Sequence, residues 1–266
     1  SLAKMTKILI TDDPRGLFDL TGKTALVTGA SQGLGRRFAW TLARAGAHVL
    51  ISARSTDKLQ SLQEEIEGFG GKATPTTLDV RDRSSIRKAI EQIESVSPID
   101  VLVNNAGVAI VKAPERYEDE DWDAVYETNL RGPWVLAQSV IQHRVADGRE
   151  CSIINIASVL GIRPLGHIPP YAATKAGIIN LGRDLCVDLA SKGIRINAIA
   201  PGYFETEMNR EWLKTEAGSK LLEGIPAGRF GQPQDLDGAI LFLASDASKF
   251  MNGNLITVDG GHSAGL

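Results

Sequence analysis

The chain has 266 residues, of which 43% are hydrophobic and 23% are charged, values typical of a globular protein with one large α/β domain. Its formal net charge of −3 leaves no basic excess, so nucleic acids and anionic membranes are not expected partners. Two cysteines without C-x-x-C spacing and four scattered histidines predict neither a disulfide framework nor a metal site. These features together indicate a small-molecule ligand.

Nothing in the hydropathy pattern indicates a membrane protein. No apolar run approaches the ~20 residues that a membrane span requires, and the first residues lack a secretory pattern. We therefore expect a cytoplasmic protein. Residues 1–16 are interpreted as an N-terminal extension and residues 17–266 as a single domain.

A β-favouring apolar run at 24–28 leads into a glycine-rich turn with the spacing G-x-x-x-G-x-G and then into a predicted helix that is ended by Gly46. A second apolar run at 48–52 completes a βαβ unit. Glycine lets the backbone approach a phosphate, and the helix N-terminus offers free N–H groups. The candidate pyrophosphate-binding residues are Gly29, Ser31, Gln32, Gly33, Leu34 and Gly35.

Arg54 follows the second predicted strand, where NAD-binding proteins usually place a carboxylate on the ribose. A carboxylate would repel a 2′-phosphate, whereas a guanidinium can bind it with paired hydrogen bonds, and the Ser31 hydroxyl can add another. The pattern therefore favours NADP(H) over NAD(H). Gln32 is neutral where a second cation would strengthen this preference, and the alternative is that Arg54 is an ordinary solvent-exposed arginine.

Two further predicted strands, at 73–78 and 99–103, end in residues that suit a cofactor site. Asp79 and Val80 follow the first of them, and Asp79 can either accept a hydrogen bond from an adenine amino group or cap the next helix, at 84–94. Asn105, Ala106 and Gly107 follow the second and suit a tight turn.

A helix predicted at 121–143 contains Asn129, although asparagine is a poor helix former. We expect its side chain to hydrogen-bond the backbone or a water and to distort the helix locally. The fifth predicted strand, at 152–156, is followed by Ser158, which can contact a substrate oxygen or serve as an ordinary turn serine.

Tyr171 and Lys175 are four residues apart on the next predicted helix and therefore share one face of it. A nearby cation favours the phenolate and lowers the pKa of a tyrosine, which would allow Tyr171 to work as a general acid or base. A half-buried ring beside a solvated lysine is the alternative for the pair alone.

The last part of the chain contains predicted strands at 194–200 and 255–258 and a helix at 233–244. Between them, residues 203–231 form a long polar connection with helix-capable pieces at 207–213 and 220–222, where we place substrate specificity. Seven buried β runs alternating with helices predict a single-domain Rossmann fold, with a doubly wound parallel sheet that binds ligands at the carboxyl ends of its strands.

Six motifs in this order resemble the short-chain dehydrogenase/reductase family, and the likeness extends from about Leu17 to Gly261. They are Thr28-Gly29-(x)3-Gly33-Leu34-Gly35, Asn104-Asn105-Ala106-Gly107, Asn129, Ser158, Tyr171-(x)3-Lys175 and Pro201-Gly202.

The resemblance implies a role for each catalytic position. Tyr171 would exchange the proton with the substrate oxygen, Ser158 would polarise that oxygen, and Lys175 would lower the Tyr171 pKa and bind the nicotinamide ribose. Asn129 would hold a water that links Lys175 to solvent. The residues expected to contact the cofactor are Gly29, Ser31, Gln32, Gly33, Leu34, Gly35, Arg54, Asp79, Val80, Asn105, Ala106, Gly107, Tyr171, Lys175, Pro201, Gly202 and Thr206.

The segments 225–231 and 258–261 resemble the branch that holds 3-oxoacyl carrier-protein reductases and gluconate 5-dehydrogenases. The expected function is an NADP(H)-dependent interconversion of a ketone and a secondary alcohol, and the family resemblance implies a homotetramer or a dimer. Two alternatives stay open: an NAD(H)-linked sugar or polyol dehydrogenase, and a non-catalytic cofactor-binding protein with a regulatory role.

Overall fold

The computed structural model describes residues 13–54, 57–207 and 209–265. These residues form a seven-stranded, entirely parallel sheet with the strand order β3-β2-β1-β4-β5-β6-β7. The predicted doubly wound Rossmann sheet is thereby confirmed. The strands are β1 Thr24–Thr28, β2 His48–Ala53, β3 Lys72–Thr77, β4 Val101–Asn104, β5 Cys151–Ile156, β6 Ile194–Pro201 and β7 Leu255–Val258.

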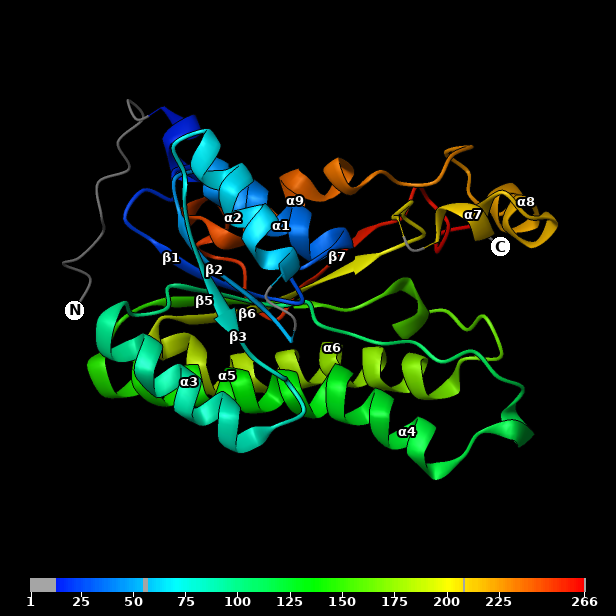
Figure 1. Cartoon of the computed structure of the whole chain (residues 1–266), viewed down its shortest axis with the longest axis horizontal. Helices are drawn as coiled ribbons and strands as arrows, with labels where there is room; N and C mark the ends of the chain where they lie inside the picture. The colour runs from blue at the N-terminus through cyan, green and yellow to red at the C-terminus, as the bar shows by residue number, and fades with distance from the viewer. Residues whose placement is uncertain (1–12, 55–56, 208, 266) are drawn as a thin grey trace, which may run out of the picture.

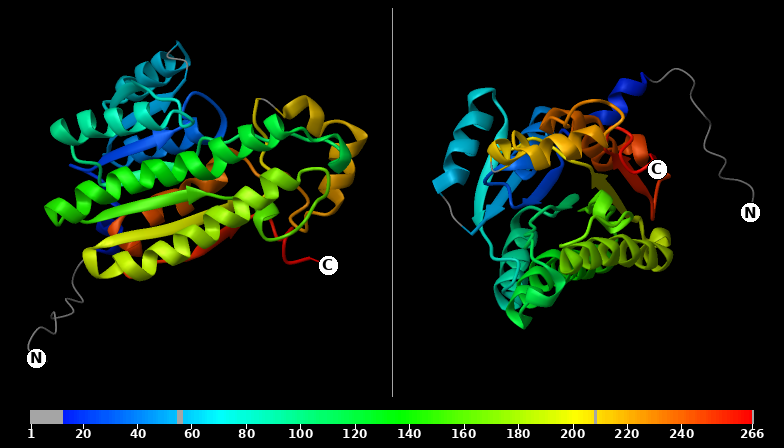
Figure 2. Two further views of the ribbon diagram at one scale, coloured as in Figure 1. Left: turned by 90° about the horizontal axis from the view of Figure 1, so that it is seen from below. Right: turned by 90° about the vertical axis from the view of Figure 1, so that its right-hand side faces the viewer.

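Helices cover both faces of the sheet (Figures 1 and 2). One face carries α1 Gly33–Arg44, α2 Asp57–Gly68 and α9 Asp237–Ala244. The other carries α3 Arg83–Val96, α4 Asp119–Tyr126, α5 Gly132–Asp147 and α6 Pro169–Leu189. Two short helices, α7 Arg210–Leu213 and α8 Glu216–Glu223, lie beyond the carboxyl end of β6.

The central strands are apolar without alternation because both of their faces are buried. In β1, Ala25 and Val27 belong to the core on the side of α1, whereas Leu26 belongs to the core on the side of α3 and α5. All five residues of β1 are buried. The sheet therefore separates two apolar layers, and its carboxyl edge is left for polar turns.

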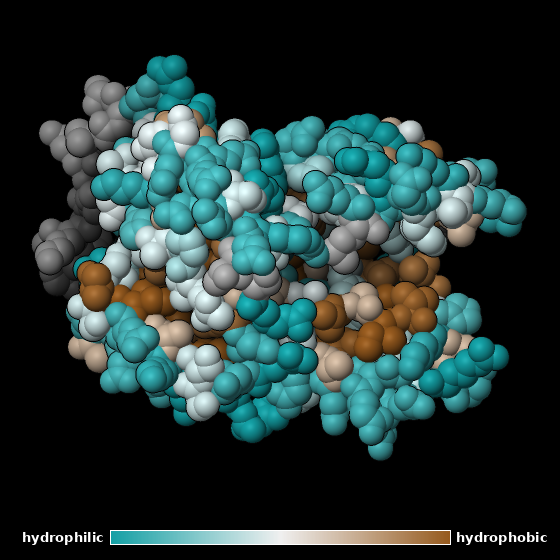
Figure 3. All heavy atoms as spheres, in the orientation of Figure 1, coloured by the Kyte–Doolittle hydropathy of each residue, from teal (hydrophilic) through white to brown (hydrophobic). Residues whose placement is uncertain are grey.

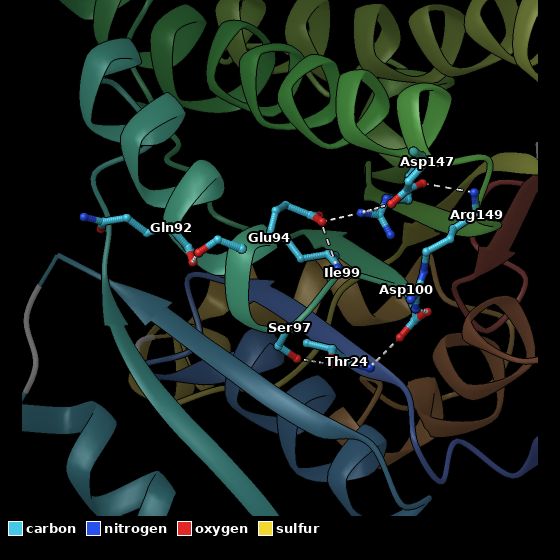
Figure 4. Close-up of polar contacts among 10 residues, drawn as sticks. Thr24, Gln92, Glu94, Ser97, Ile99, Asp100, Asp147 and Arg149 are labelled. Atoms are coloured by element: carbon cyan, nitrogen blue, oxygen red, sulfur yellow. Dashed lines mark hydrogen bonds and ion pairs between the residues drawn. The ribbon is translucent and has the colours of Figure 1, made fainter.

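A group of buried and half-buried charges holds the opposite, amino edge of the sheet together (Figure 4). Arg144 on α5, with its side chain 1% exposed, pairs with Glu94 on α3 and with Asp147. Asp100, just before β4, accepts a hydrogen bond from the Thr24 N–H at 2.8 Å. These contacts fix α3 and α5 beneath the sheet at the end away from the polar turns.

The structure corrects several predicted elements. The helix expected at 121–143 is α4 and α5 separated by a π-helical turn, Glu127–Arg131. The helix expected at 233–244 starts as a 3-10 turn, Pro233–Leu236. Within the stretch expected at 207–213, only α7 is helical among the described residues, and the piece expected at 220–222 extends over all of α8.

Asp79 does not cap the helix that follows it. The Asp82 side chain accepts hydrogen bonds from the N–H groups of Ser84 and Ser85 and caps α3 instead. Some predictions lie outside the described residues, among them most of the N-terminal extension and residues 208 and 266. No helix in the described part of the chain is long and apolar enough to cross a membrane.

Candidate active site

The turn between β1 and α1 has the backbone geometry of a phosphate cradle. Gly29 and Gly33 have φ values of +66° and +57°, a region that favours glycine. A Cβ on Gly35 would lie 2.3 Å from both the Asn105 Nδ2 and the Gly29 carbonyl oxygen. No side chain caps the start of α1. Asn105 therefore packs closely against the back of the turn, and the first N–H groups of α1 can bind a phosphate.

Thr28 and Asn105 join this turn to the turn after β4. The Thr28 Oγ1 accepts hydrogen bonds from the N–H groups of Asn105 and Ala106, both at 3.0 Å, and donates to the Val103 carbonyl at 3.3 Å. The Asn105 Nδ2 donates to the Thr28 carbonyl at 2.9 Å. Since β1 and β4 are neighbours at the point where the strand order reverses, these bonds shape the crevice in which such sheets bind nucleotides.

A cation beside the glycine turn was not predicted from the sequence. Arg54 is exposed just after β2 and forms no hydrogen bond or ion pair with any described residue. Lys58, in the first turn of α2, donates from its Nζ to the Gln32 Oε1 at 3.0 Å. The neutral Gln32 thus has a lysine beside it. An anion beside Gln32 would therefore meet the positive charge of Lys58.

Asp79 and Val80 follow β3 at the same edge of the sheet. The Asp79 carboxylate pairs with Arg81 at 2.8 Å, and this hydrogen bond, with a contribution from the Arg54 charge, lowers its pKa. A Cβ on Gly132 would lie 2.5 Å from the Val80 carbonyl oxygen, so Val80 packs closely against the start of α5. The two residues are placed beside the crevice, and their predicted contact with adenine stays a prediction.

Ser158 and Tyr171 come together from β5 and α6. Ser158 follows β5, and its Oγ accepts a hydrogen bond from the Leu160 N–H at 3.1 Å. The Ser158 side chain lies close enough to the Tyr171 hydroxyl to act on its pKa, which it lowers. Two prolines, Pro169 and Pro170, open α6, which suits the first turn of a helix because proline lacks the N–H. The predicted proximity of these hydroxyls is therefore present in the structure.

Lys175 lies beneath Tyr171. Its Nζ is 5.5 Å from the centroid of the Tyr171 ring and donates to the carbonyl of Ile156, the last residue of β5, at 2.7 Å. Burial lowers the pKa of Lys175 from 10.5 to about 8. The lysine thus ties α6 to the strand end that carries Ser158.

The pKa of Tyr171 shifts in the direction opposite to the sequence-based expectation. Burial raises it, and the nearby Ser158 side chain opposes this effect only in part. Spacing on a helix predicts which groups meet, but the depth of burial decides which charge state is favoured.

Asn129 connects the turn after β4 with α6. Its Oδ1 accepts from the Val108 N–H and its Nδ2 donates to the Val108 carbonyl, both at 2.8 Å. The same Nδ2 lies 3.4 Å from the Thr174 Oγ1. Asn129 belongs to the π-helical turn, so the expected backbone hydrogen bond and local helix distortion are both confirmed. Its predicted contact with a water stays a prediction.

Residues after β6 form the remaining wall. The Gly202 N–H donates to the Val258 carbonyl at 2.9 Å, and a Cβ on Gly202 would lie 2.7 Å from the Asp259 Cβ. The Thr206 Cγ2 would be 3.8 Å from a Cβ on Gly33, so this segment reaches the glycine turn. Figure 3 shows a hollow between the part that carries α7 and α8 and the part that carries α4, with apolar side chains on its walls.

The doubly wound sheet, the glycine turn and the serine, tyrosine and lysine at one crevice define a dinucleotide-dependent oxidoreductase of the Rossmann class. Residues 23–217 match the family model described as short chain dehydrogenase, and the chain belongs to this family. The resemblance inferred from the six motifs is thereby confirmed.

Relatives of known name cover almost the whole chain. It is 42% identical over 243 residues to the 3-oxoacyl-[acyl-carrier-protein] reductase of Thermotoga maritima, covering 91% of this chain and 98% of the relative. It is 40% identical over 252 residues to the gluconate 5-dehydrogenase of Gluconobacter oxydans, covering 94% and 98%. The solved structure of a Burkholderia cenocepacia gluconate 5-dehydrogenase in complex with NADP and tartrate has a TM-score of 0.89 at 41% identity, covering 94% and 98%.

Proposed function

We propose that the protein is an NADP(H)-dependent oxidoreductase that interconverts a ketone and a secondary alcohol, with Tyr171 as general acid and base. The observation that carries this proposal is the closeness of Tyr171 to both the Ser158 side chain and the buried Lys175. Two hydroxyls side by side in a crevice can both bond one substrate oxygen. A nicotinamide cofactor supplies or accepts the hydride when bound.

Each of these side chains has a part in moving the proton. In the reducing direction Tyr171 donates its proton to the carbonyl oxygen, while the Ser158 hydroxyl stabilises the negative charge that develops there. Burial lowers the pKa of Lys175 to about 8, so it is mostly protonated at pH 7 and can donate hydrogen bonds to the nicotinamide ribose. Asn129 holds the turn at Val108 and, as part of this proposal, a water that leads from Lys175 toward solvent.

The cofactor is proposed to bind along the carboxyl edge of the sheet. The positive φ of Gly29 and Gly33 and the lack of room for a Cβ on Gly35 support the pyrophosphate position. Arg54 and Lys58 support a 2′-phosphate, and hence NADP(H). The remaining proposed contacts are Ser31, Gln32, Leu34, Asp79, Val80, Asn105, Ala106, Gly107, Tyr171, Lys175, Pro201, Gly202 and Thr206.

Residues 203–231 are proposed to select the substrate, because Thr206 reaches the glycine turn and the part that carries α7 and α8 borders the hollow in Figure 3. The names of the relatives support two substrate classes, 3-oxoacyl thioesters and keto-acids of sugars.

Exposed apolar side chains on α6 and before β7, such as Val187 at 79% and Phe250 at 106% exposure, support association into a homotetramer or a dimer. The free thiols of Cys151 and Cys186 suit the reducing conditions of the cytoplasm.

An NAD(H)-linked sugar or polyol dehydrogenase is the second candidate, and the gluconate 5-dehydrogenase relatives favour its substrate class. Arg54 after β2 and Lys58 beside Gln32 favour a phosphorylated cofactor and therefore disfavour NAD(H). A non-catalytic cofactor-binding role would need no buried lysine beneath a tyrosine hydroxyl. Both alternatives are therefore less well supported than an NADP(H)-dependent enzyme.

A panel of 3-oxoacyl thioesters, keto-sugar acids and simple ketones, with NADPH consumption as the readout, tests the proposal. Tyr171→Phe is expected to lower turnover at least ~100-fold, because it removes the proton donor, while NADPH binding measured by fluorescence titration stays intact. An unchanged rate in this variant would refute the mechanism. Binding of NADPH without turnover of any carbonyl would favour the non-catalytic alternative.

A further inference from the structure

Tyr203 carries a buried hydroxyl that the proposed proton transfer does not use. The residue as a whole is half-buried, yet its hydroxyl oxygen is shielded from solvent and has no hydrogen-bond partner among the residues that the structure describes. Leaving a buried polar group unpaired costs about 1–3 kcal/mol, so such groups are uncommon and call for an explanation. A ligand that pairs this hydroxyl would remove the cost.

The backbone of Tyr203 is held in place on both sides. The N–H of Gly202, the preceding residue, donates to Val258 at 2.9 Å, and the Tyr203 carbonyl accepts from the Gly231 N–H at 2.9 Å. The Tyr203 ring lies edge-on to the His262 ring, with centroids 5.4 Å apart and planes at 90°. The hydroxyl is therefore fixed in position and cannot turn toward solvent without breaking this packing.

These contacts place Tyr203 beside the reaction centre. His262, which packs on its ring, accepts a hydrogen bond through its carbonyl from Arg163, five residues after Ser158. The strand that leads to Tyr203 pairs with the strand that leads to Ser158, through Ile199 and Ile156. The charge of Tyr171 contributes to the raised pKa of Tyr203, behind burial, which agrees with their closeness.

We infer that the Tyr203 hydroxyl recognises a second oxygen of the substrate, in a compound that carries a hydroxyl or carbonyl group close to the reacting carbonyl. This inference rests on the proposed function, because it assumes that Tyr171 and Ser158 hold the reacting oxygen. A second oxygen would reach the Tyr203 hydroxyl and pair it. A simple ketone would leave it unpaired and bind less well, since sites built around a hydrogen bond reject analogues that lack it.

Tyr203→Phe tests this inference because it removes only a hydroxyl that has no partner, so the variant is expected to fold as stably as the wild type. Tyr126→Phe, which changes a 37% exposed tyrosine on α4, is the matched control. Three probes are compared by kcat/KM with NADPH: 5-keto-D-gluconate, with neighbouring hydroxyls, S-acetoacetyl-N-acetylcysteamine, with a second carbonyl, and 3-pentanone, with neither.

The inference predicts that Tyr203→Phe lowers kcat/KM roughly 5- to 50-fold for one or both oxygen-rich probes. It also predicts unchanged values for 3-pentanone, for NADPH affinity and for the pH profile of kcat. The affected probe identifies whether the second oxygen is a hydroxyl or a carbonyl. If 3-pentanone is turned over too slowly to measure, NADPH affinity and the pH profile serve as the references.

Two results would overturn the assignment. Equal losses on all probes, a weaker NADPH affinity or a shifted pH profile would show that Tyr203 positions the cofactor or Tyr171 instead. Unchanged kinetics on every probe would show that the hydroxyl contacts no substrate. If the wild type reduced none of the carbonyls, the proposed function itself would be wrong. This outcome differs from one in which the wild type is active and only the role of Tyr203 is wrong.

Discussion

Replacing Thr28 by valine is expected to destabilise the protein by about 2–4 kcal/mol. The side chain is fully enclosed, with 1% of the residue exposed, and its oxygen accepts hydrogen bonds from two backbone N–H groups at 3.0 Å. Valine keeps the shape of the side chain but leaves both N–H groups without an acceptor, and each unpaired buried donor costs about 1–3 kcal/mol. The midpoint of thermal unfolding should therefore fall by roughly 5–15 °C.

Thermal and urea unfolding, followed by circular dichroism, measure this effect. Thr24→Val is the control at the other end of β1, because the Thr24 hydroxyl has a single side-chain bond, to the Ser97 Oγ at 2.7 Å, and lies away from the crevice. Thr28→Val should also weaken NADPH binding, since the turn at Asn105 loses its anchor, whereas Thr24→Val should not. Equal stability and equal NADPH affinity of the two variants would refute this account of the crevice.

The remaining predictions concern charge. Arg54→Asp should weaken NADPH binding roughly 30- to 100-fold and Lys58→Ala roughly 3- to 10-fold, because each removes a positive charge from a 2′-phosphate, while NADH binding changes little. Fluorescence titration measures the affinities for NADPH and NADH, and Lys72→Ala on β3 is the control. Unchanged NADPH binding in Arg54→Asp would contradict the proposed position of the 2′-phosphate. Between pH 7 and pH 10 the wild type should gain about 2 kcal/mol of stability relative to Lys175→Met. The folded pKa of about 8 lies below the ordinary 10.5, so the unfolded chain binds more protons in this window and raising the pH favours the folded state. Urea unfolding at both pH values measures the gain, and parallel pH dependences in the two proteins would argue against a protonated, buried lysine.

The sheet could be predicted from the sequence because burial on both faces leaves a plain signal. The strands β1 and β4 contain uninterrupted apolar runs of three residues, and the order of turns and helices leaves few topologies for the sheet. The edge strand β3, which reads Lys-Ala-Thr-Pro-Thr-Thr, carries a weaker signal, and its bounds were displaced by one residue.

Other features depend on distances that the sequence does not contain. Asp79 and Asp82 both precede α3, and only the path of the backbone decides which of them reaches the free N–H groups. The hydrogen bond between Lys58 and Gln32 depends on where the first turn of α2 lies relative to the glycine turn. A single asparagine does not reveal a π-helical turn, although Asn129 correctly indicated a distortion.

The predicted catalytic side chains lie close together in the structure, but the directions of their pKa shifts could not be predicted from the sequence. The spacing of Tyr171 and Lys175 placed them on one face, whereas the direction of each pKa shift follows from the depth of burial. Tyr203 gave no sequence signal, since an aromatic residue in a polar loop looks the same whether or not its hydroxyl is paired.

Asn129 makes two hydrogen bonds to the backbone of Val108, and Lys175 makes one to the backbone of Ile156. These bonds limit which substitutions the chain can accept during evolution. A descendant that lost its enzymatic role would still be selected to keep both residues, because without them backbone groups at the sheet edge lose their partners. Among the described residues, the Tyr171 hydroxyl has no hydrogen bond to the backbone, and the polar group that acts on it is the Ser158 side chain. Drift from tyrosine to phenylalanine at position 171 would thus be the first mark of a lineage that had retained the scaffold and abandoned the reaction.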